Sequence, residues 1–216
     1  MRHAVVTDVH GNAPGLRAVL ARAREQGVDR VLCLGDVFEC LVSKRDVADH
    51  VFTRLDEVFD QDPAPAGLLD GALLVRGNQE ERISALVPDR ELPDWARPVL
   101  DAPLALRTDF AAYCHGHALP WREVAPDLWV PLDAEFAGRA LVHGHHHRNA
   151  LHVLPRTGRA WEDVESLPVR FGEPVRLAED RRYLVNVGPV RGPAPSWAVV
   201  DEGEATVTFH RHEESA

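Results

Sequence analysis

The chain has 216 residues, of which 45% are hydrophobic and 27% are charged, as in a globular domain that buries a hydrophobic core. Its formal net charge of −10 makes nucleic acid an unlikely partner, because nonspecific binding to DNA or to anionic membranes needs a basic stripe. The apolar runs are too short to span a bilayer and no signal peptide precedes them, so we expect a cytoplasmic protein without a membrane partner.

The predicted elements begin with short buried strands that alternate with helices. We expect strands over residues 2–8, 28–34 and 72–75, and a helix over residues 14–26 that ends at Gly27. Residues 46–59 are amphipathic, and we expect them to form the second helix. This βαβαβ order predicts a parallel sheet covered by helices.

The second half of the chain no longer alternates strands with single helices. Four prolines between residues 80 and 103 indicate short helices, and we expect residues 80–110 to form a helical cap. Strand-like runs follow at 110–115, 140–143, 150–154 and 183–187, with a hairpin over 196–201 and 205–210. Residues 156–182 receive no assignment. Because no linker or repeat divides the chain, we predict one α/β domain over residues 1–216 with mixed sheets.

Candidate metal ligands follow the expected strands, where ligands bind in open α/β sheets. They are Asp8, His10, Asp36, Asn78, His115, His145 and His147. Oxygen and imidazole donors without a thiolate suit manganese, iron or zinc. This many donors exceeds the needs of one ion and suits two ions about 3.5–4 Å apart with a bridging carboxylate. Such a site is positively charged, so we expect it to attract a phosphate.

These residues lie in five short motifs with adjoining glycines. The motifs are Asp8-Val9-His10, Gly35-Asp36, Gly77-Asn78-Gln79-Glu80, His115-Gly116-His117 and Gly144-His145-His146-His147. In this order they resemble the calcineurin-like metallophosphoesterases, and most of all their compact bacterial phosphodiesterase branch. The resemblance implies a four-layer α-β-β-α sandwich, in which two mixed sheets are flanked by helices and the site lies at the top of the sheets.

The resemblance also implies a role for each ligand. One ion would be held by Asp8, His10 and His147, the other by Asn78, His115 and His145, and both by Asp36. A hydroxide that bridges two divalent ions would attack phosphorus in line. We therefore expect a metal-dependent phosphoesterase, with Mn²⁺ as the first choice of ion and Fe or Zn²⁺ as alternatives. Its substrate would be a small phosphate ester or a nucleotide.

One position departs from the family pattern. The family commonly has His after the metal-binding Asn, where it helps to protonate the leaving oxygen, but this chain has Gln79. General-acid catalysis contributes about 10²–10⁴-fold, so an amide that gives no proton should favour phosphodiesters and activated esters over alkyl monoesters. His117 is a candidate substitute donor. The expected catalytic residues are therefore Asn78, Gln79 and His117.

Alternative functions remain open on the same residues. A phosphomonoesterase or a dinucleotide pyrophosphohydrolase would use the same site, whereas a noncatalytic protein-interaction scaffold would use only the fold. Trp95, Trp121 and Trp129 either pack internally or stack on a nucleobase. Glu80 either orients a neighbouring ligand or caps a helix. The oligomeric state is not readable from the sequence.

Overall fold

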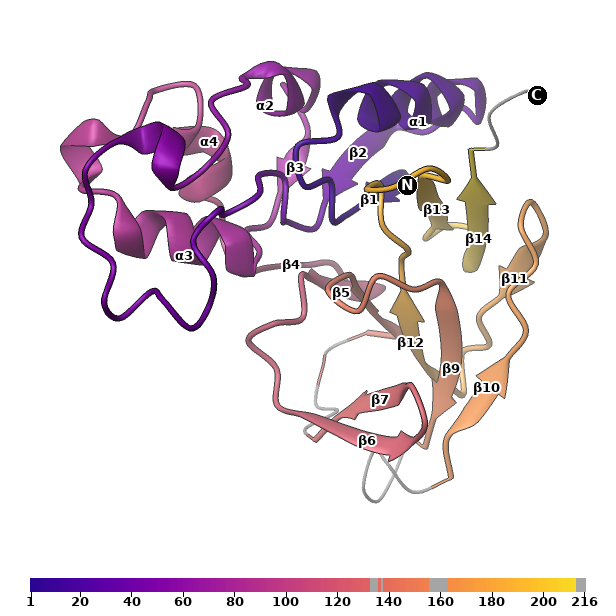
Figure 1. The fold of residues 1–216 in the computed structure, drawn as a ribbon. Coiled ribbons are helices and arrows are strands. Elements are labelled where there is room, and N and C mark those ends of the chain that lie inside the picture. The colour runs from indigo at the N-terminus through magenta and orange to yellow at the C-terminus, as the bar shows by residue number, and fades with distance from the viewer. Residues whose placement is uncertain (133–135, 137, 156–162, 213–216) are drawn as a thin grey trace.

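The structure is a computed structural model that describes residues 1–132, 136, 138–155 and 163–212 (Figure 1). It contains two six-stranded sheets. The first has the order β11-β14-β13-β1-β2-β3, with β11 Pro174–Arg176, β14 Thr206–Arg211, β13 Ser196–Asp201, β1 Arg2–Val6, β2 Arg30–Cys33 and β3 Leu73–Leu74. The second has the order β10-β9-β12-β8-β5-β4, with β10 Glu165–Leu167, β9 Ala150–Leu154, β12 Arg182–Asn186, β8 Ala140–His143, β5 Ala111–Cys114 and β4 Ala105–Arg107.

Both sheets are mixed, as predicted. Strands β1, β2 and β3 run parallel, and β13 pairs with β1 in the antiparallel sense. In the second sheet β5, β8 and β12 run parallel, whereas β9 and β4 are antiparallel to their neighbours β12 and β5. The parallel strands of each sheet therefore bring their carboxyl ends to one edge, where loops can place functional side chains close together.

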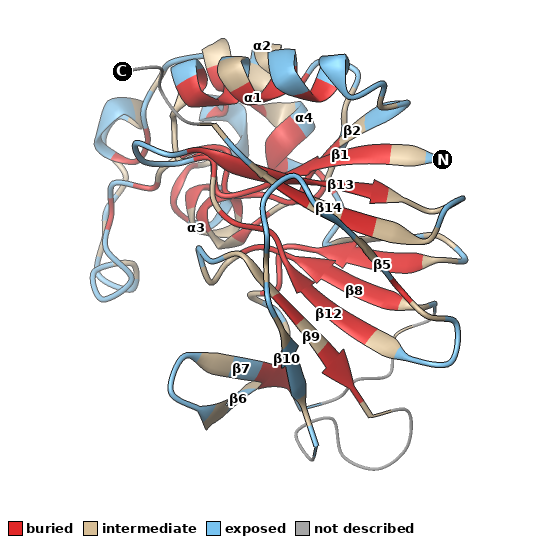
Figure 2. Cartoon of the chain, turned by 90° about the vertical axis from the view of Figure 1, so that its right-hand side faces the viewer, coloured by how far each residue is buried: buried red, intermediate tan, exposed pale blue. Residues whose placement is uncertain are grey.

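The main core lies between the two sheets. Neighbouring residues of a strand point to opposite faces, so Val5 of β1 packs between the sheets with Tyr113 and Val185, while Val6 packs on the other face with Leu16. Figure 2 shows this buried layer along β1, β13, β5, β8 and β12. The short apolar runs of the sequence are therefore strands buried on both faces.

Helices cover the outer face of the first sheet (Figure 1). They are α1 Ala13–Glu25, α2 Ala64–Leu68, α3 Asn78–Leu86 and α4 Arg97–Leu100, with two 3₁₀ helices, η1 Leu55–Glu57 and η2 Asp89–Glu91. α1 begins where Asn12 Oδ1 accepts a hydrogen bond from Gly15 N at 3.0 Å. It ends before Gly27, whose φ is 64°.

The outer face of the second sheet is covered differently. Beyond Leu100 the described residues contain no helix. A two-stranded hairpin of β6 Trp121–Ala125 and β7 Leu128–Pro131 covers this face instead, with Val130 packed against Leu141 and Leu184. The mixed α/β sandwich is confirmed, but the fourth layer that we expected to be helical is this hairpin in the described part of the chain.

The predicted strands and the first helix agree with the structure to within one or two residues at each end. The prediction of a second helix over residues 46–59 was wrong. In the structure this segment contains turns and one short 3₁₀ helix, η1. Its apolar residues do not share one face, because Val58 and Phe59 are buried while Val51 is 77% exposed. The segment is a loop anchored at one end by the pairing of Phe59 with Cys40.

Two further regions were less clear in the sequence. The proline-rich region contains α3, η2 and α4, but residues 105–107 belong to the second sheet as β4. That this region acts as a cap, and that the chain is one domain, stay predictions. The unassigned residues 156–182 contain β10 and β11, and residues 156–162 lie outside the described residues. None of the described helices is long and apolar enough to cross a membrane.

Candidate metal centre

The structure brings the predicted ligands together at one edge of the sandwich. Asp8 and His10 follow β1, Asp36 follows β2, and Asn78 follows β3 at the first position of α3. The second sheet contributes the other ligands from the loops after β5 and β8, namely His115, His145 and His147. Both sheets therefore supply the site, from the carboxyl ends of their parallel strands.

One set of donors surrounds the carboxylate of Asp8. Ligand atoms of Asp8, His10, Asp36 and His147 all lie within 4.8 Å of one another. His147 Nε2 is 3.1 Å from Asp8 Oδ1, and His10 Nε2 is 3.6 Å from Asp36 Oδ2. These residues could hold one metal ion.

A second set of donors adjoins the first through Asp36. His115 Nε2 lies 3.3 Å from Asp36 Oδ2, 3.1 Å from Asn78 Oδ1 and 3.2 Å from His145 Nδ1. The same Oδ2 atom of Asp36 therefore faces both His10 and His115. Asp36 could therefore bridge two ions.

Several atoms of the centre are better placed to coordinate a cation than to form hydrogen bonds with one another. Asp8 Oδ1 is buried, and no described residue gives it a well-directed hydrogen bond, although His147 Nε2 is 3.1 Å away. The imidazole nitrogens of His10 and His147 lie 3.3 Å apart. A buried carboxylate oxygen and converging nitrogen lone pairs are satisfied by a divalent ion.

The charges of the centre also favour a bound cation. Burial and the nearby His115 lower the pKa of His145 to about 4, so this imidazole is neutral. Burial opposes ionisation of Asp8, but the surrounding histidines lower its pKa. Burial alone would lower the pKa of His115, yet Asp36 and Asp8 raise it to about 9. The carboxylates thus attract a positive charge into the site.

The backbone at the ligands adopts an unfavourable conformation. Five ligands have positive φ, namely Asp8 at 53°, His10 at 47°, Asp36 at 52°, His145 at 70° and His147 at 53°. Each such residue costs of order 1–3 kcal/mol and persists only where the surrounding structure holds it in place, and such residues cluster at functional sites. Gly144 permits the approach of two of these loops, because a Cβ there would lie 2.0 Å from Thr7 Oγ1.

Oxygen acceptors outside the centre hold the ligand loops in position. His115 Nδ1 lies 2.8 Å from Leu34 O, and His10 Nδ1 lies 2.5 Å from Glu39 Oε2. Such contacts fix the ring tautomer and direct Nε2 into the centre. Glu80 is fully buried and accepts hydrogen bonds from four backbone N–H groups, those of Asp36, Val37, Phe38 and Gly77. It therefore joins the loop after β2 to the start of α3.

Sequence reasoning anticipated an orienting or capping role for Glu80 but missed Glu39. The only signal for Glu39 was its place three residues after the ligand Asp36. Gln79 is buried, and its Oε1 accepts hydrogen bonds from Cys40 N at 3.0 Å and from Arg82. Its backbone N donates to Asp36 Oδ1 at 2.9 Å. The carbonyl end of Gln79 is therefore engaged in holding the loop that follows β2.

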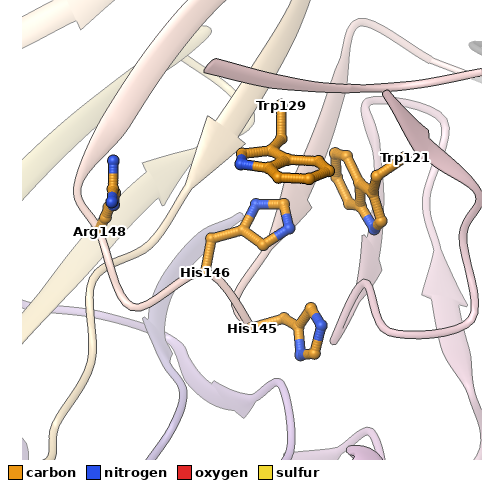
Figure 3. Close-up of a pocket in the computed structure, with 5 residues that line it drawn as sticks. All are labelled: Trp121, Trp129, His145, His146 and Arg148. Atoms are coloured by element: carbon orange, nitrogen blue, oxygen red, sulfur yellow. The ribbon is translucent and has the colours of Figure 1, made fainter. Parts of the chain in front are cut away.

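His117 lies at the border of the second donor set. Its ring centroid is 5.3 Å from that of His115 and 6.3 Å from that of His145. Its Nε2 is 3.0 Å from Glu81 Oε2. Next to His145, a hollow is lined by Trp121, Trp129, His146 and Arg148 (Figure 3). The centre thus has titratable and aromatic neighbours.

Comparisons with known proteins identify relatives of this chain. The chain is 25% identical, over 231 aligned positions, to an uncharacterized protein of Methanocaldococcus jannaschii, covering 97% of this chain and 86% of that protein. The crystal structure of a metallophosphoesterase from Sphaerobacter thermophilus has the same fold, with a TM-score of 0.67 at 22% identity, covering 99% of this chain and 88% of that one. A model of the calcineurin-like phosphoesterase superfamily domain matches residues 1–204. The chain therefore belongs to the calcineurin-like phosphoesterase superfamily.

Proposed function

We propose that this protein hydrolyses phosphodiesters with two divalent metal ions. The observation that carries the proposal is the position of Asp36 Oδ2, which lies 3.6 Å from His10 Nε2 and 3.3 Å from His115 Nε2. Asp36 would thus be shared by two sets of ligands: Asp8, His10 and His147 for one ion, and Asn78, His115 and His145 for the other. Mn²⁺ is the first choice for these oxygen and nitrogen donors, with Fe and Zn²⁺ as alternatives.

Two bound ions would supply Lewis acidity for a phosphoryl group and would lower the pKa of water to a useful range. The chain itself orients the donors. Glu39 and the carbonyl of Leu34 engage Nδ1 of His10 and His115, which leaves each Nε2 free to face the centre. The backbone N–H of Gln79 holds the remaining oxygen of Asp36. These contacts preorganise the site before substrate arrives.

Proton transfer to the leaving oxygen is the weaker part of this site. Gln79 has no proton to give, and its carbonyl oxygen is bonded to Cys40 N. His117 is our candidate donor because it adjoins His115 and His145, and Asn78 would help to position the phosphoryl group through its amide. Limited general-acid assistance favours diesters with good leaving groups over alkyl monoesters.

The test compares two chromogenic substrates on protein that has been stripped with a chelator and reloaded with Mn²⁺. We expect manganese-dependent hydrolysis of bis-p-nitrophenyl phosphate to exceed that of p-nitrophenyl phosphate. Asp36→Asn should lower the diester rate about 100-fold or more, because a shared ligand is lost. The matched variant Asp109→Asn changes an exposed carboxylate and should leave the rate unchanged.

Two results would contradict the proposal. A preference for the monoester would retain the metal centre but overturn the diester assignment. Absence of turnover on both substrates, with two ions shown to be bound, would overturn the enzymatic function and favour the noncatalytic scaffold.

A further inference from the structure

A hollow of 370 Å³ opens directly beside the metal centre. Its lining residues are Trp121, Trp129, His145, His146 and Arg148 (Figure 3). His145 belongs to both places, because its ring lines the hollow while its Nδ1 lies 3.2 Å from His115 Nε2. A substituent on a phosphate held at the centre can therefore reach this hollow without leaving the protein surface.

Aromatic rings form the walls of this hollow, and one of them is fixed in place. Trp121 Nε1 donates a hydrogen bond to Gly116 O at 2.7 Å, and its ring lies 4.8 Å from that of His143 and 4.6 Å from that of His146. Trp129 stands on the other strand of the hairpin and remains 38% exposed. Figure 3 shows the Trp129 indole next to the His146 ring, with Trp121 beside both. The exposed Trp129 indole at the hollow offers a stacking face to a planar ring.

Charge on the remaining side of the hollow is balanced within the protein. Arg148 donates to Asp127 Oδ1 at 2.7 Å, and Asp127 lies in the turn between β6 and β7. The guanidinium therefore binds the hairpin to the loop that carries His145 and His147. A neutralised cation beside aromatic walls favours an uncharged ring with polar edges over a second phosphate group.

A larger hollow of 610 Å³, lined in part by His147, is less suited to a ring. Besides His147, its aromatic residue is Phe171, and the guanidinium of Arg211 lies over one face of that ring, 4.2 Å from the ring centroid. The hollow beside His145 is the one of these two with open indole surface.

We propose that the hollow formed by Trp121, Trp129, His146 and Arg148 is a nucleobase subsite. The substrate class would then be nucleotide-type phosphodiesters, with the phosphate at the metal centre and the base stacked on Trp129. This inference rests on the proposed function, because it needs a phosphate bound at the metal ions. Trp129 would be a specificity-determining residue for that reaction.

The test uses adenosine 5′-monophosphate and ribose 5-phosphate, which differ only in the base. Isothermal titration of the Mn²⁺-loaded protein should show that the nucleotide binds about 5- to 150-fold more tightly, which is the range for stacking one base on an aromatic side chain. Trp129→Ala should remove this preference and leave ribose 5-phosphate binding unchanged. Trp129→Phe keeps an aromatic face and should retain most of the preference.

A control variant shows whether the preference for the nucleotide arises in this hollow. Phe171→Ala alters the larger hollow and should not change that preference. Equal affinity for the two ligands, an unchanged preference in Trp129→Ala, or its loss in Phe171→Ala would overturn the subsite. If only the subsite is wrong, ribose 5-phosphate still binds and the chromogenic diester is still hydrolysed. If the proposed function is wrong, the chromogenic diester is not hydrolysed in preference to the monoester, whether or not ribose 5-phosphate binds.

Discussion

Replacing Glu80 with Gln tests how the loop that carries Asp36 is held against the start of α3. Glu80 Oε2 accepts hydrogen bonds from Gly77 N at 2.7 Å and Asp36 N at 2.8 Å. Its Oε1 accepts from Val37 N at 2.9 Å and Phe38 N at 3.2 Å. Because glutamine has one carbonyl oxygen, two of these backbone donors would face an NH₂ group in Glu80→Gln.

The structure sets the size of this effect. A hydrogen bond to a charged group contributes about 1.5–3 kcal/mol, so two lost bonds amount to about 3–6 kcal/mol. Burial and the nearby charge of Asp36 raise the pKa of Glu80, which means that removing its charge also relieves an unfavourable contribution. We therefore expect Glu80→Gln to lower the free energy of unfolding by about 2–4 kcal/mol.

Urea unfolding of the chelator-stripped protein measures this change without a contribution from bound metal. Glu25→Gln is the matched control: its carboxylate is 58% exposed and pairs at the surface with Arg22, so it should change stability by no more than about 1 kcal/mol. If Glu80→Gln were as stable as Glu25→Gln, the carboxylate of Glu80 would not be what joins the two segments.

Two further predictions concern Glu39 and His3. Glu39→Gln should weaken Mn²⁺ binding about 10- to 100-fold, because Glu39 orients His10 through Nδ1, and calorimetric titration with an unchanged affinity would exclude that role. Burial lowers the pKa of His3 below 6.5 despite the nearby Glu202, so the unfolded chain binds more protons and stability falls as pH drops below about 6.5. His3→Leu should reduce this slope by up to about 1.4 kcal/mol per pH unit in urea unfolding between about pH 7.5 and 5.5, and an unchanged slope would contradict the assignment.

Much of the site was predictable because its ligands follow apolar runs. A short run such as residues 2–6 can be buried on both faces of a sheet, and a polar residue directly after it lies at the carboxyl edge. The places of Asp8, Asp36 and His115 after β1, β2 and β5 were predicted in this way. Parallel neighbours then brought these separate ligands together, which the sequence order of strands and helices already implied.

The parts that escaped prediction depend on contacts between distant residues. Glu39 meets His10 across 29 positions of the chain, and neither residue type nor spacing indicates that pair. The loop over 46–59 resembled a helix because its apolar residues recur, yet only Val58 and Phe59 are fully buried in the core. The hairpin of β6 and β7 has apolar residues that pack on the second sheet, so its role depends on tertiary structure.

The position of β1 in its sheet has a consequence for how the protein folds during synthesis. β1 carries the loop with Asp8 and His10, and it lies between β2, which follows it closely in the chain, and β13, which is synthesised much later. Until residues 196–201 emerge from the ribosome, β1 has one open edge with unpaired backbone groups. A chain cut short before β13 would keep every candidate metal ligand but would expose this edge to pairing with other chains.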